Sequence, residues 1–351
     1  MRAPAAGRTP PTATRPIVLN NRAATRPTVT GVERWTAEVT GRLRALAPER
    51  YLVAEPPRRA RGRILAQGWE QLALPAVAAR RRAALVFSPA NLAPLAWPRN
   101  VVVIHDAAVL RHPDAYSPAY RLWHARIGLA AARRARAVIT VSEFSRRELL
   151  ALAGLDAERV AVIPGGVGEQ FAPATDGRGP DLAQPYVLTL ATADARKNLS
   201  ALTPAAAALA QRGIELVWAG DARPYFTETE RVTGVRRVGY VAERDLPGLY
   251  RNALAFVLPS RYEGFGLTCV EAMACGTPVV AADRAALPET CGGAALLVDP
   301  DDPAALAAAV VKAATEPGVR AGLREAGLRR ARTFTWDRTV AEVDALLMRL
   351  A

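Results

Sequence analysis

Short runs of Val, Ile and Leu alternate with longer Ala-, Leu- and Arg-rich segments along the whole chain. The short runs have the length and composition of buried strands, and the longer segments have those of helices. In the first half of the chain we expect strands at 17–20, 51–55, 84–88, 101–106, 137–142 and 160–166. In the second half we expect them at 186–192, 214–220, 235–241, 255–260, 278–283 and 294–300. This alternation predicts an α/β protein whose parallel sheets carry helices on both faces.

The chain is long enough for two domains, because its 351 residues exceed the usual size of one hydrophobic core. Residues 165–185 are rich in Gly, Pro and Asp and show neither helical nor strand periodicity, so they contain the expected connection. The boundaries that we expect are a loose tail at 1–16, a first domain at 17–168, a linker at 169–185 and a second domain from 186. Two doubly wound domains that face each other bring their strand ends to a central cleft, where we expect a ligand.

Positive charge is concentrated in the first half of the chain. The formal net charge is +13; residues 1–180 hold 27 Arg against 13 acidic residues, whereas residues 181–351 hold 19 Lys and Arg against 20 acidic residues. An Arg-rich domain attracts phosphates and anionic lipid headgroups, although such runs also fit an ordinary solvated surface. Nucleic acid is not expected as a partner, because no aromatic residues interleave with the arginines and no DNA-binding motif is present.

Composition and motif spacing argue against several classes of protein. No apolar run approaches the roughly 20 residues that span a bilayer, and residues 1–16 lack the apolar core of a signal peptide. The three cysteines, Cys269, Cys275 and Cys291, lack CxxC or Cys/His spacing, which disfavours a disulfide framework and a zinc site. We therefore expect a protein of the reduced cytoplasm.

The stretch RYEGFGLTCVEAMACGTPVV at 261–280 carries the strongest chemical signal. It follows an apolar strand, contains a Gly-rich turn, and continues as a helix that begins near Phe265 or Gly266. The free N–H groups of Gly266, Leu267 and Thr268, together with the helix dipole, favour a bound phosphate. The alternative is a capped surface helix without a ligand.

Two carboxylates flank this turn. Glu271 lies four residues after Leu267 and therefore on the same helix face, toward the predicted phosphate. A carboxylate does not help to bind phosphate, but it can accept two hydrogen bonds from a vicinal diol such as a ribose. Glu263, on the turn itself, is placed to contact a second polar part of the same ligand.

Lysine is almost absent, since the chain has only Lys197 and Lys312 against 44 arginines. Lys312 fits an ordinary exposed position in an Ala-rich helix. Lys197 follows Arg196 in the sequence ARKN, where a strand ends and a helix begins. The two cations are placed there to neutralise a pyrophosphate leaving group. Chance retention of this lysine is the alternative.

The sequence EGFGLTCVEAMACGTPVV, with Glu263 and Glu271 in a Glu-x7-Glu arrangement, and ARKNL upstream resemble the retaining glycosyltransferases of family 4. The likeness covers nearly the whole chain in the order of the family, through the segments 27–39, 101–118, 137–150, 159–166 and 334–347. It implies the GT-B fold, with two Rossmann-like doubly wound domains facing a central cleft. The first domain, 17–168, would bind the acceptor and the second, 186–334, the nucleotide sugar. A C-terminal helix at 335–351 would pack back toward the first domain.

The resemblance also implies roles for individual residues. Glu271 would bind the donor ribose, Glu263 would contact the donor sugar, and Arg196 and Lys197 would hold the diphosphate. The other implied positions are Gly31 on the first loop, His105 in the sugar pocket, Val241 beside the nucleobase, and Phe265, Gly266, Leu267 and Thr268 at the helix start. Where the family usually has Gly and Pro in its basic loop, this chain has Ala191 and Ala195.

Two further patterns have competing interpretations. His105 and Asp106 could form a general-base pair, but neighbours on a strand point to opposite faces, so we interpret Asp106 as loop support or an acceptor contact. The sequence DPD at 299–301 matches a metal-binding Asp-x-Asp pattern, yet helix capping fits it better. We expect neither a metal nor a cofactor besides the sugar nucleotide, because Arg196, Lys197 and the helix N-terminus supply positive potential.

The resemblance therefore predicts a metal-independent, retaining hexosyltransferase. The loop RHPDAYSP favours GDP-mannose as donor, with UDP- and dTDP-sugars as alternatives. The acceptor would be a hydroxyl of a glycan, a lipid-linked intermediate or a small molecule. The basic first domain would make peripheral contact with the anionic inner face of the membrane. The alternative is a non-catalytic subunit of a glycan-assembly complex, whose donor-site residues would have been lost.

Overall fold

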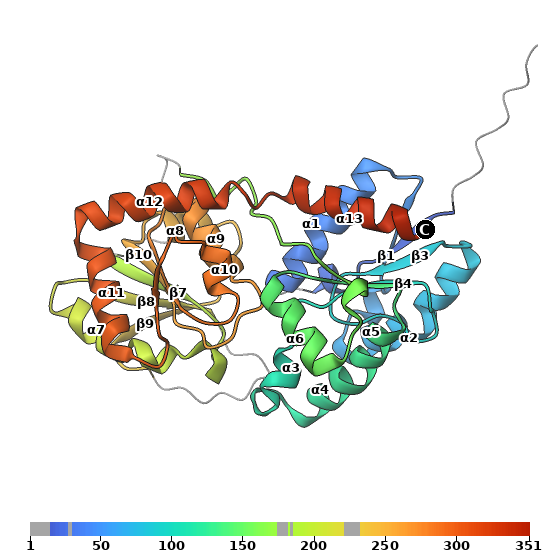
Figure 1. Cartoon of the computed structure of the whole chain (residues 1–351), viewed down its shortest axis with the longest axis horizontal. Coiled ribbons are helices and arrows are strands. Elements are labelled where there is room, and N and C mark those ends of the chain that lie inside the picture. The colour runs from blue at the N-terminus through green and yellow to red at the C-terminus, as the bar shows by residue number, and fades with distance from the viewer. Residues whose placement is uncertain (1–14, 27–29, 174–181, 183–184, 221–231) are drawn as a thin grey trace, which may run out of the picture.

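The computed structural model describes residues 15–26, 30–173, 182, 185–220 and 232–351. It consists of two α/β lobes side by side, each built on a six-stranded sheet (Figure 1). The predicted pair of doubly wound domains is thereby confirmed. The predicted tail at 1–16 lies outside the described residues except for its last two, and most of the predicted linker at 169–185 also lies outside them.

All six strands of the first sheet are parallel, in the order β2-β1-β3-β4-β5-β6. The strands are β1 (Ile17–Asn20), β2 (Tyr51–Ala54), β3 (Leu85–Ser88), β4 (Asn100–Val103), β5 (Ala137–Thr140) and β6 (Val160–Val162). The helices of this lobe are α1 (Gly31–Leu46), α2 (Arg63–Arg80), α3 (Ala108–Arg111), α4 (Pro118–Trp123), α5 (Leu129–Arg134) and α6 (Glu143–Ala153). The strand order reverses between β1 and β3, which is the switch point of a doubly wound sheet.

The second sheet repeats this plan in the order β12-β11-β10-β7-β8-β9, again with parallel strands. Its strands are β7 (Tyr186–Leu190), β8 (Glu215–Ala219), β9 (Val235–Gly239), β10 (Ala255–Leu258), β11 (Val279–Ala282) and β12 (Leu296–Val298). Its helices are α7 (Thr203–Ala210), α8 (Leu246–Arg251), α9 (Leu267–Ala274), α10 (Leu287–Cys291), α11 (Pro303–Thr315) and α12 (Pro317–Ala331). The strand order reverses between β7 and β10. The loops that follow these two strands therefore turn to opposite sides and leave a crevice between them.

Each of the twelve predicted strand segments overlaps one of these strands, and only β4 extends beyond its segment, beginning one residue earlier at Asn100. The strands β1, β3, β4, β5, β10 and β11 are buried along their whole length, because helices cover both faces of each sheet. The edge strand β9 differs, since only part of it is shielded. There the exposed Arg237 places its guanidinium 4.1 Å from the centre of the buried Trp218 ring on the neighbouring strand β8.

The last helix, α13 (Trp336–Leu350), belongs to the core of the first lobe although it follows the second in sequence. Its apolar side chains Trp336, Val340, Val343, Leu346 and Leu347 pack with residues of α1 and the first sheet. In Figure 1 it lies beside α1, away from α12. The two chain crossings between the lobes also touch, because Val167 pairs in parallel with Thr335 and its N–H donates to the carbonyl of Phe334 at 3.1 Å.

Helix α2 leaves apolar side chains in contact with solvent. Ile64, Leu65 and Leu72 are 82%, 60% and 79% exposed, and their spacing places them on neighbouring positions of one helix face. Three arginines just before the helix are also exposed: Arg58, Arg59 and Arg61. Across the described ranges, no helix combines the length and apolarity required to cross a bilayer.

The packing of α13 predicts that Leu347→Ala destabilises the first lobe by about 2–5 kcal/mol, because it removes a fully buried leucine from a packed core. Its neighbour Met348 is 41% exposed on the same helix, so Met348→Ala serves as the matched control and should change stability by less than about 0.5 kcal/mol. Urea unfolding followed by fluorescence measures both. Equal stability of the two variants would contradict the assignment of α13 to this core.

Candidate functional site

Loops at the carboxyl ends of the two sheets contact each other along one seam. The hydroxyls of Ser142 and Ser145, just after β5, donate to the Gly264 carbonyl after β10 at 2.6 and 3.0 Å. The Glu289 carboxylate, from α10, accepts two backbone N–H groups at the start of α6 at 2.8 and 3.0 Å. The seam therefore joins the edges at which doubly wound folds bind their ligands.

Helix α9 begins at this seam, within one residue of the predicted start. Its N-cap is Gly266, whose φ of +89° lies in the left-handed region and which has no side chain with which to cap the helix. This conformation favours glycine, and a Cβ atom here would also lie 2.5 Å from the end of the Leu287 side chain, which would have to move. The N-cap residue therefore does not occupy the free N–H groups at the positive end of the helix dipole, a position that favours anions in general.

Glu271 lies on α9 and is only 2% exposed. One carboxylate oxygen accepts a hydrogen bond from the Tyr250 hydroxyl at 3.0 Å. Burial raises the pKa of Tyr250 well above its usual value, so this hydroxyl keeps its proton and donates it. The other oxygen of Glu271 forms an ion pair with Arg34 of α1, in the first lobe. The same guanidinium contacts Glu243, after β9, with 2.5 Å between Nε and Oε1.

Lys197 and Glu263 form an ion pair at the switch point of the second sheet. Their Nζ and Oε1 atoms are 2.6 Å apart, and both side chains are partly exposed. The loops that carry them are joined by Asn198, whose amide donates to the carbonyls of Pro259 at 3.1 Å and Pro300 at 2.8 Å. Asn198 adopts a left-handed conformation with φ of +53°, which asparagine tolerates better than most residues. The turn thereby brings one cation and one carboxylate close together at the seam.

Arg196 points to a different environment from its neighbour. Its Nε atom lies 3.1 Å from the Asp194 carboxylate, and its guanidinium lies 5.2 Å from the centre of the Tyr116 ring in the first lobe. Arg196 is 8% exposed and so is buried where the two lobes meet. The structure therefore places Lys197 beside Glu263, and it places Arg196 between Asp194 and Tyr116.

His105 follows β4 and is buried within the first lobe. Its Nε2 atom is 3.0 Å from the Pro89 carbonyl, and its ring meets the Trp35 ring edge-on at 5.6 Å between centroids. Burial lowers the pKa of His105, so the neutral imidazole donates from Nε2 to that carbonyl. Asp106 accepts the backbone N–H of Ala108 at 2.9 Å, which is the loop-supporting contact considered for it above.

The remaining predicted residues lie on both sides of the seam. Gly31 opens α1, and a Cβ atom there would lie 3.9 Å from the Leu267 side chain across the seam. Phe265 packs against the cores of both lobes, and its ring lies 5.3 Å from that of Phe334. Thr268 is partly buried in the first turn of α9. Val241 packs against the core of the second lobe just after β9, two residues before Glu243.

The two carboxylates of the Asp-x-Asp pattern form ion pairs with arginines. Asp299 and Asp301 both contact Arg284, at 3.0 and 2.6 Å, and Asp301 also contacts Arg261. Hydrogen bonds from Arg261 and Arg284 lower the pKa of the Asp301 carboxyl. The next residue, Asp302, caps α11. Among the residues that the structure describes, no group of three or more His, Cys, Asp or Glu side chains is arranged to hold a metal ion.

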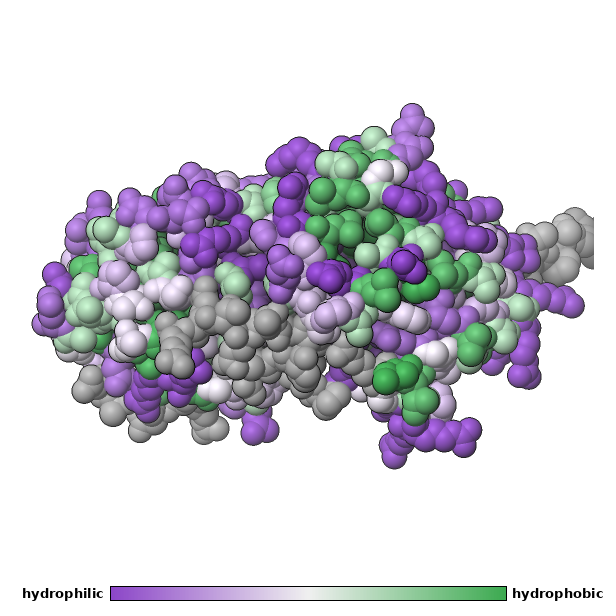
Figure 2. All heavy atoms as spheres, turned by 90° about the horizontal axis from the view of Figure 1, so that it is seen from below, coloured by the Kyte–Doolittle hydropathy of each residue, from purple (hydrophilic) through white to green (hydrophobic). Residues whose placement is uncertain are grey.

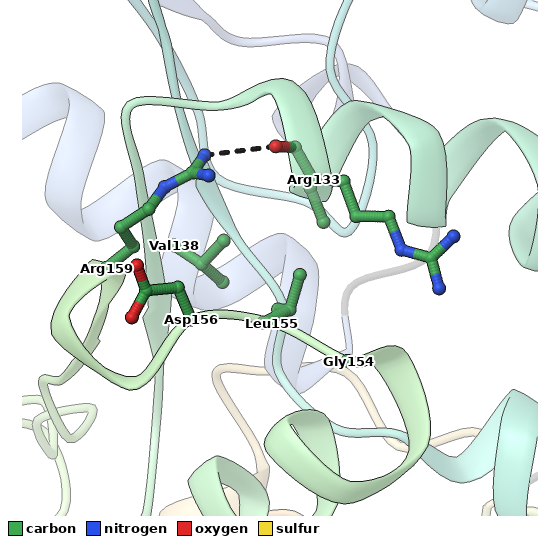
Figure 3. A pocket seen from close by; sticks show the side chains of 7 residues that line it. Arg133, Val138, Gly154, Leu155, Asp156 and Arg159 are labelled. Atoms are coloured by element: carbon green, nitrogen blue, oxygen red, sulfur yellow. Dashed lines mark hydrogen bonds between the residues drawn. The ribbon is translucent and has the colours of Figure 1, made fainter.

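A cavity of about 190 Å³ lies elsewhere, at the amino end of β5 in the first lobe (Figure 3). Arg133 and Arg159 line it, but they do not converge on its space. Arg159 donates to the Arg133 carbonyl at 3.1 Å, and the guanidinium of Arg133 points away from that of Arg159. None of the predicted site residues lines this cavity, so the seam remains the candidate site.

Sequence reasoning missed several residues that complete the seam: Arg34, Glu243, Tyr250, Asn198 and Glu289. Arg34 carries no local signal, because it is one of 44 arginines and its partner Glu271 lies 237 positions later. Asn198 could have been found, since an asparagine directly after ARK fits a turn that needs a left-handed residue.

Comparisons with known proteins agree with this architecture. The profile described as Glycosyltransferase Family 4 matches residues 29–171, and that of Glycosyl transferases group 1 matches residues 184–316. Among solved structures, sucrose-phosphate synthase from Thermosynechococcus elongatus superimposes with a TM-score of 0.75 at 21% identity, over 96% of this chain and 99% of that one. This likeness confirms the predicted GT-B fold.

Curated relatives extend the match along the sequence. The chain is 32% identical over 257 residues to O-antigen chain mannosyltransferase B of Escherichia coli, which covers 68% of this chain and 67% of that protein. It is 29% identical over 275 residues to the serotype-specific mannosyltransferase WbdA of Escherichia coli, covering 72% of this chain. The chain spans only 33% of the length of WbdA. The identity to the first relative and the two matched profiles, one on each lobe, show that the chain belongs to glycosyltransferase family 4.

Proposed function

We propose that this protein transfers a hexose from a nucleotide diphosphate sugar to a hydroxyl group, with retention of the anomeric configuration and without a metal ion. Mannose from GDP-mannose is the favoured donor, since both relatives named above are mannosyltransferases. The acceptor would be a glycan, a lipid-linked intermediate or a small molecule. The proposed site is the seam between the lobes.

The observation that carries the proposal is the contact of Lys197 with Glu263, three residues before the glycine N-cap of α9 at Gly266. The helix dipole and the Lys197 ammonium place positive potential on one side of the seam, as a diphosphate requires. An ammonium has three donors, so Lys197 can keep its contact with Glu263 and still bind a phosphate oxygen. Arg196 is held by Asp194 and Tyr116, so we assign Lys197 the main contact and Arg196 a supporting electrostatic role.

Glu271 and Glu263 would position the other parts of the donor. The carboxylate of Glu271 is oriented by Tyr250 and lies on α9, so it can accept hydrogen bonds from a ribose diol. Val241 would lie near the nucleobase, and His105 would form part of the sugar pocket in the first lobe. His105 is neutral and bonded to Pro89, so it would contribute shape and a fixed dipole rather than a proton.

The chemistry depends on stabilising the departing nucleotide. As the bond from the sugar to the diphosphate breaks, negative charge grows on the phosphate, and Lys197 with the α9 N–H groups would stabilise it. The acceptor hydroxyl would attack the sugar from the face that the diphosphate leaves, and a phosphate oxygen would take the proton of this hydroxyl. Glu263 is paired with Lys197, so it would orient the sugar and stabilise its positive charge rather than act as a covalent nucleophile.

We also propose that the first lobe contacts an anionic membrane surface through α2, with the protein on the cytoplasmic side. Within residues 58–82, six arginines are exposed: Arg58, Arg59, Arg61, Arg80, Arg81 and Arg82. The one acid in that range, Glu70, is buried and paired with Arg22 at 3.0 Å. Exposed apolar side chains on α2 would enter the headgroup region while these arginines meet lipid phosphates. On the face shown in Figure 2, apolar side chains gather mainly over this lobe.

Lys197→Ala should reduce sugar transfer by about a hundredfold or more, because it removes a cation from the developing negative charge. The chain supplies a matched control, since its other lysine, Lys312, is exposed on α11. Lys312→Ala should keep full activity. Sugar transfer is measured with radiolabelled donor, and circular dichroism checks that each variant is folded. Full activity of folded Lys197→Ala protein would exclude the proposed role.

A calorimetric panel of GDP, UDP and dTDP, with and without magnesium, tests the donor site directly. We expect one nucleotide to bind without metal, and we expect Glu271→Gln to weaken it about tenfold, because a charged acceptor to the ribose diol is lost. Failure of the well-folded wild-type protein to bind any nucleotide would favour the non-catalytic subunit instead.

Sedimentation with liposomes tests the membrane contact. The wild-type protein should bind phosphatidylglycerol vesicles at low salt and release them at about 0.5 M salt, because headgroup attraction is screened. The double variant Ile64→Asp, Leu72→Asp should bind about tenfold less, because it places charge at the exposed apolar positions. Leu46→Asp, which changes a leucine 58% exposed on α1, is the matched control. Absence of binding by the wild-type protein at low salt would contradict the contact.

A further inference from the structure

Arg34 connects the two lobes at the position proposed for the donor ribose. It extends from α1 and forms ion pairs with Glu271 on α9 and with Glu243 after β9. Its side chain is 11% exposed, and that of Glu271 is 2% exposed, whereas that of Glu243 is 37% exposed. The contact is therefore buried at Glu271 and open to solvent at Glu243.

Both oxygens of Glu271 are in use in this arrangement. One accepts from Tyr250, within the second lobe, and the other pairs with Arg34, from the first lobe. A ribose diol that binds this carboxylate needs acceptor positions directed into the seam. Tyr250 approaches from the core of its own lobe, where it is fully buried, so it does not compete for the seam side. Arg34 does compete.

We propose that Arg34 occupies the ribose position in the ligand-free protein and that the incoming nucleotide must displace it from Glu271. The inference rests on the proposed role of Glu271 in binding the donor. Glu243 makes the exchange feasible, because the displaced guanidinium keeps one carboxylate partner and is not left buried and unpaired. Nucleotide entry then breaks the contact between α1 and α9, while the ion pair of Arg34 with Glu243 still joins the two lobes.

Competition and damage to the protein change nucleotide affinity in opposite directions. A residue that supports the fold or binds the donor weakens nucleotide affinity when it is removed. A residue that occupies the site strengthens affinity when it is removed, because the nucleotide no longer has to displace it. We therefore expect Arg34→Ala to bind its preferred nucleotide about fivefold more tightly, or better, than the wild-type protein.

The experiment is calorimetric titration of the preferred nucleotide from GDP, UDP and dTDP into the full-length protein. Arg42→Ala is the matched control, since Arg42 lies on the same helix and pairs with Asp337 at 2.7 Å outside the seam contacts. It should leave affinity unchanged. Glu243→Gln removes the charge of the other carboxylate partner of Arg34, and it should not tighten binding. If Arg34→Ala does not fold, Arg34→Gln removes the charge with less change in shape and should shift affinity in the same direction.

Each outcome separates the inference from the function on which it rests. Tighter binding by the Arg34 variant alone supports displacement at Glu271. Unchanged or weaker binding by that variant overturns it, and weaker binding would make Arg34 a donor ligand. Equal tightening by Glu243→Gln would also overturn it, since the effect would then come from loosening the lobes. A wild-type protein that binds no nucleotide refutes the proposed function itself.

Discussion

The strands of a parallel sheet all end at one edge, and this constraint determines where everything else in the protein lies. After each strand, a helix returns the chain to the opposite edge of the sheet. The loops that carry functional side chains therefore gather at the carboxyl ends of the strands. Both lobes obey the constraint, and their carboxyl edges meet. Residues from positions as distant as Arg34, Lys197 and Glu271 therefore share one seam, although no two of them are close in the sequence.

The seam depends on a close approach of backbone to backbone. A Cβ atom at Gly264 would lie 2.6 Å from the carbonyl oxygen of His105, so only glycine allows the turn after β10 to reach the first lobe. The carbonyl of Gly264 then accepts two serine hydroxyls from that lobe. Its neighbours are thereby fixed, with Glu263 directed to Lys197 and Phe265 packed between the two cores.

The fold was predictable from the sequence because strands buried on both faces form continuous apolar runs. Such runs can be located in the sequence without knowing which strands pair with each other. The start of α9 was predictable because Gly264 and Gly266 lie between an apolar strand and a helical run, where glycines mark a turn. The adjacent cations Arg196 and Lys197 were expected to act together, but successive residues of a tight turn point in different directions. One meets Asp194 and Tyr116, and the other meets Glu263. Long-range partners such as Arg34 and Glu271 leave no periodic or local signal, so only the packed structure reveals them.

The position of α13 has a consequence for how the protein forms during synthesis. The second lobe is built from a continuous stretch of chain, so it can fold once α12 has left the ribosome. The first lobe begins earlier but lacks Trp336, Val343 and Leu347 of its core until α13 emerges. Domains usually fold in the order in which they are made. Here the order of completion is reversed, because the core of the first lobe stays incomplete until α13, which follows the whole second lobe, packs against it.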